Sequence, residues 1–202
     1  MIYETLLGND FQRLHPKLQQ RYRLSLHEPF QATGMMQVIH SGPRYLRPMY
    51  QLFTKNRFLF PESGVMVPFT LSNSCRINDD KEAEVYWERT FYFPKTTRQF
   101  NAKMTMDLQR GIVKDYLGDP SLFYSDLKFD VTTDGFLLIR SEQQRLVIGK
   151  KEASLPSLLT GRVVVTEGYD DALNMYTIHV SIFNDLIGRM MMYAGQFSPS
   201  NI

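Results

Sequence analysis

From Gly64 onward, apolar and polar residues alternate in short segments that turn residues separate. A period of two is typical of strands that bury one face. We predict strands or strand pairs within residues 64–77, 82–94, 98–108, 111–118, 127–149 and 161–183. Asp134-Gly135 and Asp170-Asp171 mark the expected turns of two hairpins. No long helical segment separates these stretches, so the pattern favours an antiparallel sheet over a parallel one.

The first third of the chain has a helical pattern instead. In residues 9–25, Phe11, Leu14, Leu18 and Tyr22 recur at helical spacing, and Pro16 interrupts them. We therefore expect a short turn and then a helix with Pro16 in its first turn. A strand is expected near residues 30–40, and a second helix within residues 43–64. The closing stretch, 184–197, fits either a helix or a strand.

These elements together predict an α+β fold that is mainly antiparallel β. The turn spacing is typical of sandwiches and barrels, and we expect a barrel or deep half-barrel of about 9–10 strands. Two helices from the N-terminal third would pack against the barrel or close one mouth. Because no linker, repeat or low-complexity tract interrupts the chain, we predict a single domain over residues 1–202.

Composition excludes several classes of function. A net charge of only +2 gives no strong case for nucleic-acid binding. The single cysteine, Cys75, excludes an internal disulfide framework. The sequence shows no signal peptide and no apolar run long enough for a transmembrane segment, so we expect a cytoplasmic protein. Motifs for metal ions, nucleotides and a nucleophilic serine are absent from the sequence, which predicts no metal, no cofactor and no catalytic triad.

The segment VYWERTFYF, residues 85–93, contains an unusual charge. Reading every second residue gives one face with Val85, Trp87, Arg89, Phe91 and Phe93. A guanidinium cannot lose its charge in a protein, so an arginine on an apolar face must be paired, reach water or bind something.

Two interpretations of Arg89 follow. It pairs with a carboxylate on a neighbouring strand or extends to water at the sheet edge. Alternatively, it anchors an acidic head group in a pocket whose apolar wall is Trp87, Phe91 and Phe93, since the guanidinium fork suits carboxylate and phosphate. If the opposite face points inward, Glu88 becomes a polar group of the pocket instead. The sequence does not determine which face of this strand points inward.

Several patches resemble an uncharacterised bacterial family. They are YETLLGNDFQRLHPKLQQRY, FPESGVMVPFTLSN, ERTFYFPKTTRQFNAKM and NDLIGRMMMYAGQF, and they span nearly the whole chain. The resemblance implies a self-contained unit that occurs free-standing or fused C-terminally to saccharopine-dehydrogenase-like reductases. A reductase is therefore a possible partner. Relatives often carry His-Pro where this chain has Asn184-Asp185, and no activity is implied.

We predict from these observations non-catalytic binding of a small apolar or amphipathic ligand, with Arg89, Trp87, Phe91, Phe93 and Glu88 as binding residues. One alternative is an enzyme acting on a lipid-like substrate, with Glu88 or Asp107 as its acid or base.

A second alternative is a docking module for a reductase or a membrane surface. It would use the basic, aromatic segment 44–60, which carries Arg44, Arg47 and Arg57. The sequence alone does not decide whether the protein is an enzyme.

Overall fold

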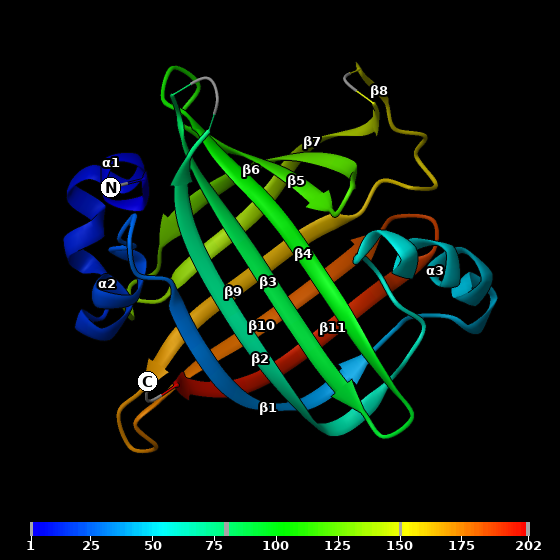
Figure 1. Cartoon of the computed structure of the whole chain (residues 1–202), viewed down its shortest axis with the longest axis horizontal. Helices are drawn as coiled ribbons and strands as arrows, with labels where there is room; N and C mark the ends of the chain where they lie inside the picture. Colours follow the sequence, from blue (N-terminus) through cyan, green and yellow to red (C-terminus); the bar gives the residue numbers. More distant parts are fainter. Residues whose placement is uncertain (1, 79–80, 150, 201–202) are drawn as a thin grey trace.

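The structure is a computed structural model that describes residues 2–78, 81–149 and 151–200. Within these residues, eleven antiparallel strands form one sheet, and ten of them close into a barrel (Figure 1). The strands are β1 (Phe30–His40), β2 (Gly64–Ile77), β3 (Ala83–Phe93), β4 (Thr96–Asp107), β5 (Ile112–Gly118), β6 (Ser121–Val131), β7 (Leu137–Ile148), β8 (Lys151–Ser154), β9 (Arg162–Asp170), β10 (Met175–Asn184) and β11 (Gly188–Pro199). The predicted fold class is confirmed.

Most neighbours in the barrel are also consecutive in the chain. The strands follow the order β6-β5-β4-β3-β2-β1-β11-β10-β9-β7, and pairing between β6 and β7 closes the circle. One exception is the pairing of β1 with β11, which joins the first strand to the last, from Ala32↔Pro199 to His40↔Met192. A second interruption occurs at β7, which pairs with β9 only over Leu137–Arg140 and then with the short β8.

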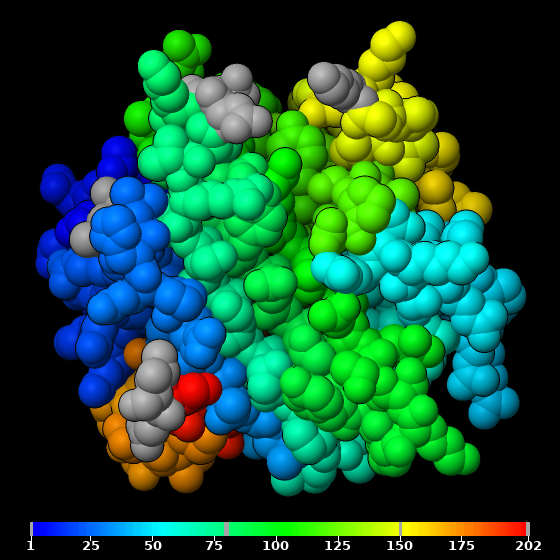
Figure 2. Space-filling view, viewed as in Figure 1, coloured from blue at the N-terminus to red at the C-terminus, as the bar shows by residue number. Residues whose placement is uncertain are grey.

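The helices lie at the two ends of the barrel. α1 (Ile2–Leu7), the 3₁₀ turn Gly8–Arg13 and α2 (Pro16–Tyr22) lie at one end, and α3 (Arg47–Phe53) lies at the other (Figure 1). Figure 2 shows the N-terminal segment in blue and the α3 region in cyan on opposite flanks of the strands. Short 3₁₀ turns, Arg44–Leu46 and Thr54–Asn56, flank α3.

Local sequence explains where these elements begin and turn. Pro16 occupies the first turn of α2, as predicted, and the His15 side chain accepts a hydrogen bond from the backbone N–H of Lys17. The β6–β7 hairpin turns at Gly135, whose φ of +75° favours glycine. The carbonyl of Gly135 also accepts a hydrogen bond from His15 N, which ties α2 to the barrel.

Several predicted boundaries were wrong. α1 was not predicted, and the second predicted helix contains only the α-helical residues Arg47–Phe53, because the chain from Phe58 to Pro61 leaves the helix and is buried in the core. The ambiguous stretch 184–197 is mainly strand β11. β8 was also missed, since all four of its residues are exposed and show no buried face.

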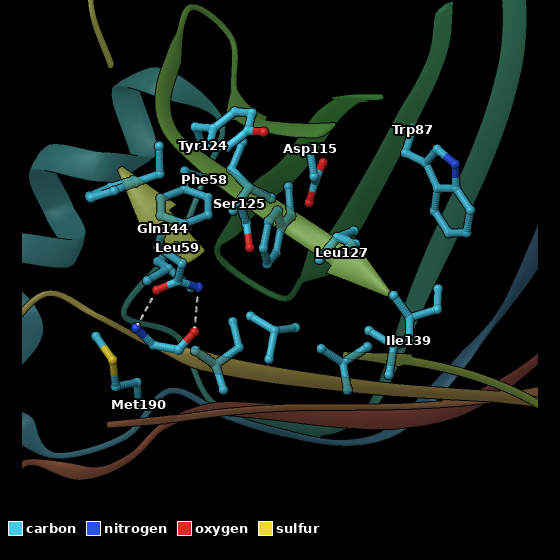
Figure 3. Close-up of a pocket in the computed structure, with 18 of the residues that line it drawn as sticks. Phe58, Leu59, Trp87, Asp115, Tyr124, Ser125, Leu127, Ile139, Gln144 and Met190 are labelled. Carbon is cyan, nitrogen blue, oxygen red and sulfur yellow. Dashed lines mark hydrogen bonds between the residues drawn. The ribbon is translucent and has the colours of Figure 1, made fainter. Parts of the chain in front are cut away.

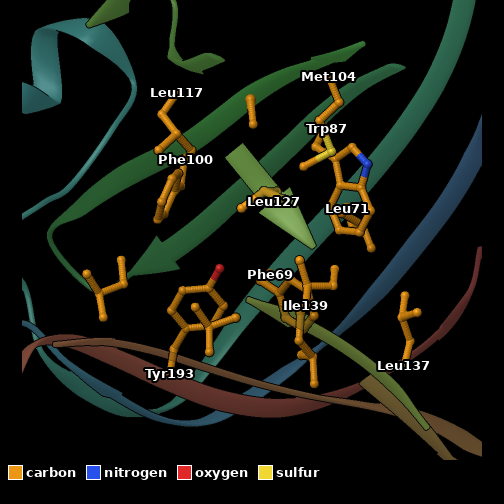
Figure 4. Close-up of a cluster of buried hydrophobic side chains, with 14 of the residues drawn as sticks. Phe69, Leu71, Trp87, Phe100, Met104, Leu117, Leu127, Leu137, Ile139 and Tyr193 are labelled. Carbon is orange, nitrogen blue, oxygen red and sulfur yellow. The ribbon is translucent and has the colours of Figure 1, made fainter. Parts of the chain in front are cut away.

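The barrel interior is filled mostly by apolar and aromatic side chains (Figure 4). Phe69, Leu71, Trp87 and Phe100 come from consecutive strands of one wall, and Tyr193 faces them from β11. Their alternation with outward residues is the period-two pattern seen in the sequence. The interior is therefore a packed core, and any open space within it is a local feature.

Candidate functional site

The face of β3 that carries Arg89 points into the barrel. Val85, Trp87, Arg89 and Phe91 are buried inside the barrel, whereas Glu88 is exposed on its outer face. The arginine is therefore held among apolar side chains in the interior, and the alternative in which Glu88 points inward is wrong.

Arg89 is held by neutral groups. Its Nε donates to the carbonyl of Phe100 at 3.1 Å, and its Nη1 donates to the hydroxyl of Tyr193 at 2.7 Å. The guanidinium carbon also lies 4.4 Å from the centre of the Phe100 ring, a cation–π contact. Within the described residues Arg89 forms no ion pair. The expected structural pair with a carboxylate is thus not found in that part of the chain.

A carboxylate does lie in the same part of the interior. Asp115 of β5 is only 4 % exposed, and its Oδ1 has no hydrogen-bond partner among the described residues. Burial raises the pKa of Asp115 from 3.8 to about 7, and the positive charge of Arg89 opposes that rise. Near neutral pH this carboxyl group therefore exists in both protonation states.

Arg89 and Asp115 line one cavity of about 80 Å³ (Figure 3). Trp87, Phe100 and Leu127 supply part of an apolar wall. In Figure 3 the Asp115 carboxylate points into this space from β5, and Ser125 and Gln144 add polar groups to the lining. A mostly apolar space with a few converging polar groups is the usual composition of a small-molecule site.

The cavity lies toward the α3 end, where a loop covers it. We name residues 155–161 the strap; Leu155, Leu159 and Gly161 of the strap line the cavity. Gln144 holds the strap by donating to Gly161 O at 2.6 Å and accepting from Gly161 N at 2.8 Å (Figure 3). Asn184 donates to the carbonyls of Ser157 and Thr160. The strap thus fills the place where β7 and β9 separate.

Only two of the five predicted binding residues line the cavity. Trp87 and Arg89 line the cavity. Phe91 lies deeper in the core, with its ring centre 5.3 Å from that of Phe60 and 5.5 Å from that of Tyr193. Phe93 is half-buried against Phe60, at 5.7 Å. Neither phenylalanine lines the cavity, and Glu88 lies outside the barrel.

Asp115 and Ser125 were missed in the sequence, although a signal was present for Asp115. In the segment IVKDYLG, Val113, Asp115 and Leu117 share one face, so a charge again stands between apolar residues. This is the pattern that identified Arg89. Gln144 had no comparable signal, because its role depends on the separation of β7 from β9.

The opposite end of the barrel contains a second buried charge cluster. Arg21 of α2 and Glu167 of β9 are both buried, and their Nη1 and Oε2 atoms are 2.7 Å apart. The hydroxyl of Tyr22 also donates to Glu167 at 2.7 Å. An open polar groove of about 600 Å³ lies beside α2, but its Arg21 is already paired. We therefore take the smaller, apolar cavity as the candidate site.

The basic, aromatic segment 44–60 is divided between core and surface. Tyr50, Phe58 and Phe60 are buried in the core, while Tyr45 and Leu52 remain exposed. Most of the aromatic face therefore packs against the barrel. Docking of a partner through this segment stays a prediction.

A family model described as "Domain of unknown function (DUF4166)" matches residues 14–197. The chain belongs to this family. It is also 37% identical over 196 residues to the protein named "Uncharacterized protein YndH" from Bacillus subtilis (strain 168), with 97% of this chain and 95% of that protein covered. The DUF4166 match covers both β3 and β5, which carry Arg89 and Asp115.

Two further features concern membranes and metals. Among the helices that the structure describes, none is long and apolar enough to cross a membrane. In the same residues, no three His, Cys, Asp or Glu side chains gather as a metal-binding group.

Proposed function

We propose that this DUF4166 protein binds a small amphipathic molecule, without reacting it, in the barrel cavity, with Arg89 pairing with an acidic head group. The observation that carries the proposal is a guanidinium buried in an apolar cavity with no ion pair among the described residues. A buried charge is costly unless it is paired, so an anionic ligand would supply the missing partner.

The volume of the cavity limits the ligand. About 80 Å³ is smaller than the roughly 150 Å³ that holds benzene in an engineered core, and far below the usual range for drug-sized ligands. A head group with a short chain fits this space. A longer chain requires the strap to move, because Leu155 and Leu159 close the cavity on that side.

The first test is to identify what the protein carries. Native mass spectrometry of purified protein, followed by organic extraction, should reveal a stoichiometric small molecule with an acidic group. A protein without bound mass leads to the second test, a direct titration.

Trp87 makes that titration specific, because it is the single tryptophan of the chain and lines the cavity. Butanoate should change its fluorescence saturably in the wild-type protein and not in Arg89→Met. The matched control is Arg140→Met, which removes an exposed arginine that pairs with Asp130 on the surface. Equal responses from wild type and Arg89→Met would contradict the proposal.

Asp115 favours a second candidate function. Its raised pKa of about 7 and its position in the cavity are what a general acid or base needs. The two carboxylates first considered for this role, Glu88 and Asp107, do not line the cavity. An enzyme is supported if wild-type protein converts the extracted ligand and Asp115→Asn binds it without conversion.

A further inference from the structure

Arg89 and Asp115 face one cavity, and each lacks a partner that a ligand could provide. Arg89 forms no ion pair and Asp115 Oδ1 accepts no hydrogen bond within the described residues. We propose that the cavity takes a small monocarboxylic acid together with one proton, which Asp115 and the ligand carboxyl group share while Arg89 balances the remaining negative charge. This inference rests on the proposed function and names its ligand class.

Two charged groups face the cavity. Arg89 carries a fixed positive charge, and ionised Asp115 compensates it from a distance. A carboxylate that enters brings a second negative charge into an apolar space of about 80 Å³. Two carboxylates that share a buried site do not both ionise readily, so one proton is taken up. The complex is then neutral, with one guanidinium and one carboxylate.

Hydrogen bonding points to the same ligand. A protonated carboxyl group donates one hydrogen bond and an ionised one accepts several. When the ligand carboxylate accepts from both Arg89 and protonated Asp115, the arginine gains an anionic partner and the aspartic acid proton is satisfied. A purely apolar ligand leaves both groups unpaired, and a phosphate of charge −2 leaves an excess negative charge.

The neighbours of Asp115 determine which group responds to pH. The charged or titratable neighbours are Arg89 on β3, Tyr193 on β11 and Tyr3 on α1. The residues paired with Asp115 are Met104 on β4 and Ser125 on β6, and neither titrates near neutral pH. Burial raises the pKa of both tyrosines, so they stay neutral in this range. Of these groups, Asp115 is the one whose pKa lies near 7, because burial raises it.

The volume selects short acids. At about 80 Å³ the cavity suits a carboxyl group with a chain of a few carbons, surrounded by Trp87, Phe100 and Leu127. Butanoate is therefore a suitable probe, and butanamide is a neutral control of nearly the same shape.

The experiment is a titration of the whole protein with butanoate from about pH 5.5 to about pH 8.5, followed by Trp87 fluorescence. We expect a constant Kd below about pH 7 and a roughly tenfold weakening per pH unit above it, because the proton must then be taken from solvent. Calorimetry in two buffers of different ionisation enthalpy counts that proton. The uptake should approach one proton per butanoate at the highest pH and fall toward zero at the lowest.

Two comparisons complete the test. Asp115→Asn keeps an N–H donor but cannot ionise, so its Kd for butanoate should no longer depend on pH. Butanamide should bind wild type without proton uptake.

The possible failures are distinct. Butanoate binding with a flat pH profile and no buffer dependence overturns the proton-linked acid and leaves the proposed function standing. If neither butanoate nor butanamide changes the fluorescence of wild type at millimolar concentration, both proposals are overturned. The buffer experiment uses wild type alone, so it decides the matter even if Asp115→Asn does not fold.

Discussion

The two ends of the barrel handle buried charge in opposite ways. At the α2 end, Arg21 and Glu167 contact each other and Tyr22 adds a hydrogen bond to the carboxylate. At the α3 end, Arg89 and Asp115 both face an apolar cavity, and neither forms an ion pair with any residue that the structure describes. Glu167 Oε1 also lacks a hydrogen-bond partner in the described part of the chain, so incomplete hydrogen bonding alone does not distinguish the two ends. The direct contact between opposite charges, which Arg21 and Glu167 make at the α2 end, does.

This difference distinguishes a structural charge from one available to a ligand. The Arg21–Glu167 pair fastens α2 across the barrel mouth, and nothing further is needed to neutralise it. The mouth at the other end is closed by the strap through neutral hydrogen bonds from Gln144 and Asn184. The α2 end is thus closed by a buried ion pair, whereas the α3 end is closed by hydrogen bonds between neutral groups.

Breaking the α2 closure should have the largest effect on stability. Glu167→Gln leaves Arg21 buried without a counter-charge, so the free energy of unfolding should fall by about 3–5 kcal/mol. Urea denaturation measures this change. Glu4→Gln is the control, because Glu4 pairs with Arg23 at the surface and should contribute less than about 1 kcal/mol. Similar losses in both variants would contradict a structural role for the buried pair.

Removing the cavity carboxylate should have an effect that depends on pH. The folded pKa of Asp115, about 7, lies above its unfolded value of 3.8, so its contribution to stability is full below about pH 4 and is lost as pH rises to about 7. The Asp115→Asn variant has no ionisable group at this position, so its free energy of unfolding does not fall in this way as pH rises. As pH rises from about 4 to about 7, the free energy of unfolding of Asp115→Asn should increase relative to that of wild type by up to about 4 kcal/mol. Above about pH 7 the difference should stay constant.

Denaturation curves at a series of pH values would test this prediction. A constant difference between Asp115→Asn and wild type would show that the carboxyl group titrates normally. It would also contradict the proposal that Asp115 takes up a proton near pH 7 when a ligand binds.

Loosening the strap should have a smaller, local effect. Gln144→Ala removes two hydrogen bonds to Gly161 and should lower the protection of residues 155–161 in hydrogen exchange by about 1–2 kcal/mol. Gln143→Ala is a matched control, because its exposed side chain accepts one long hydrogen bond from Arg145. Protection at Glu167 on β9 should be unchanged; a global loss of protection would contradict a local closure.

The smallest effect is expected at Glu88, which lies one residue from Arg89 but on the outer face. Glu88→Gln should change the free energy of unfolding by less than about 0.5 kcal/mol and leave the butanoate titration unchanged. A loss of binding in this variant would indicate that the ligand lies outside the barrel.

Sequence reasoning predicted the fold better than the site. The alternation along residues 64–183 requires only local information, and it correctly predicts β2 to β5, β7, β9, β10 and both hairpin turns. For β6 the prediction began at residue 127 and missed its first half, since β6 starts at Ser121. Trp87 and Arg89 were found because a charge on an apolar face is visible in one strand. Asp115 gives the same signal on another strand, yet its relation to Arg89 depends on barrel closure. The roles of Gln144 and Asn184 require knowledge of where β7 leaves β9, and β8 has no buried face to reveal it.

The pairing of β1 with β11 has a consequence for synthesis of the chain. Every other neighbour in the barrel can pair soon after it leaves the ribosome, since β7 and β9 are separated only by β8 and the strap. β1 must wait until Gly188–Pro199 has been translated. Until then the nascent sheet has two unpaired edges, which are the usual starting points for aggregation. Emergence of β11 is therefore the step that turns an open sheet into a barrel.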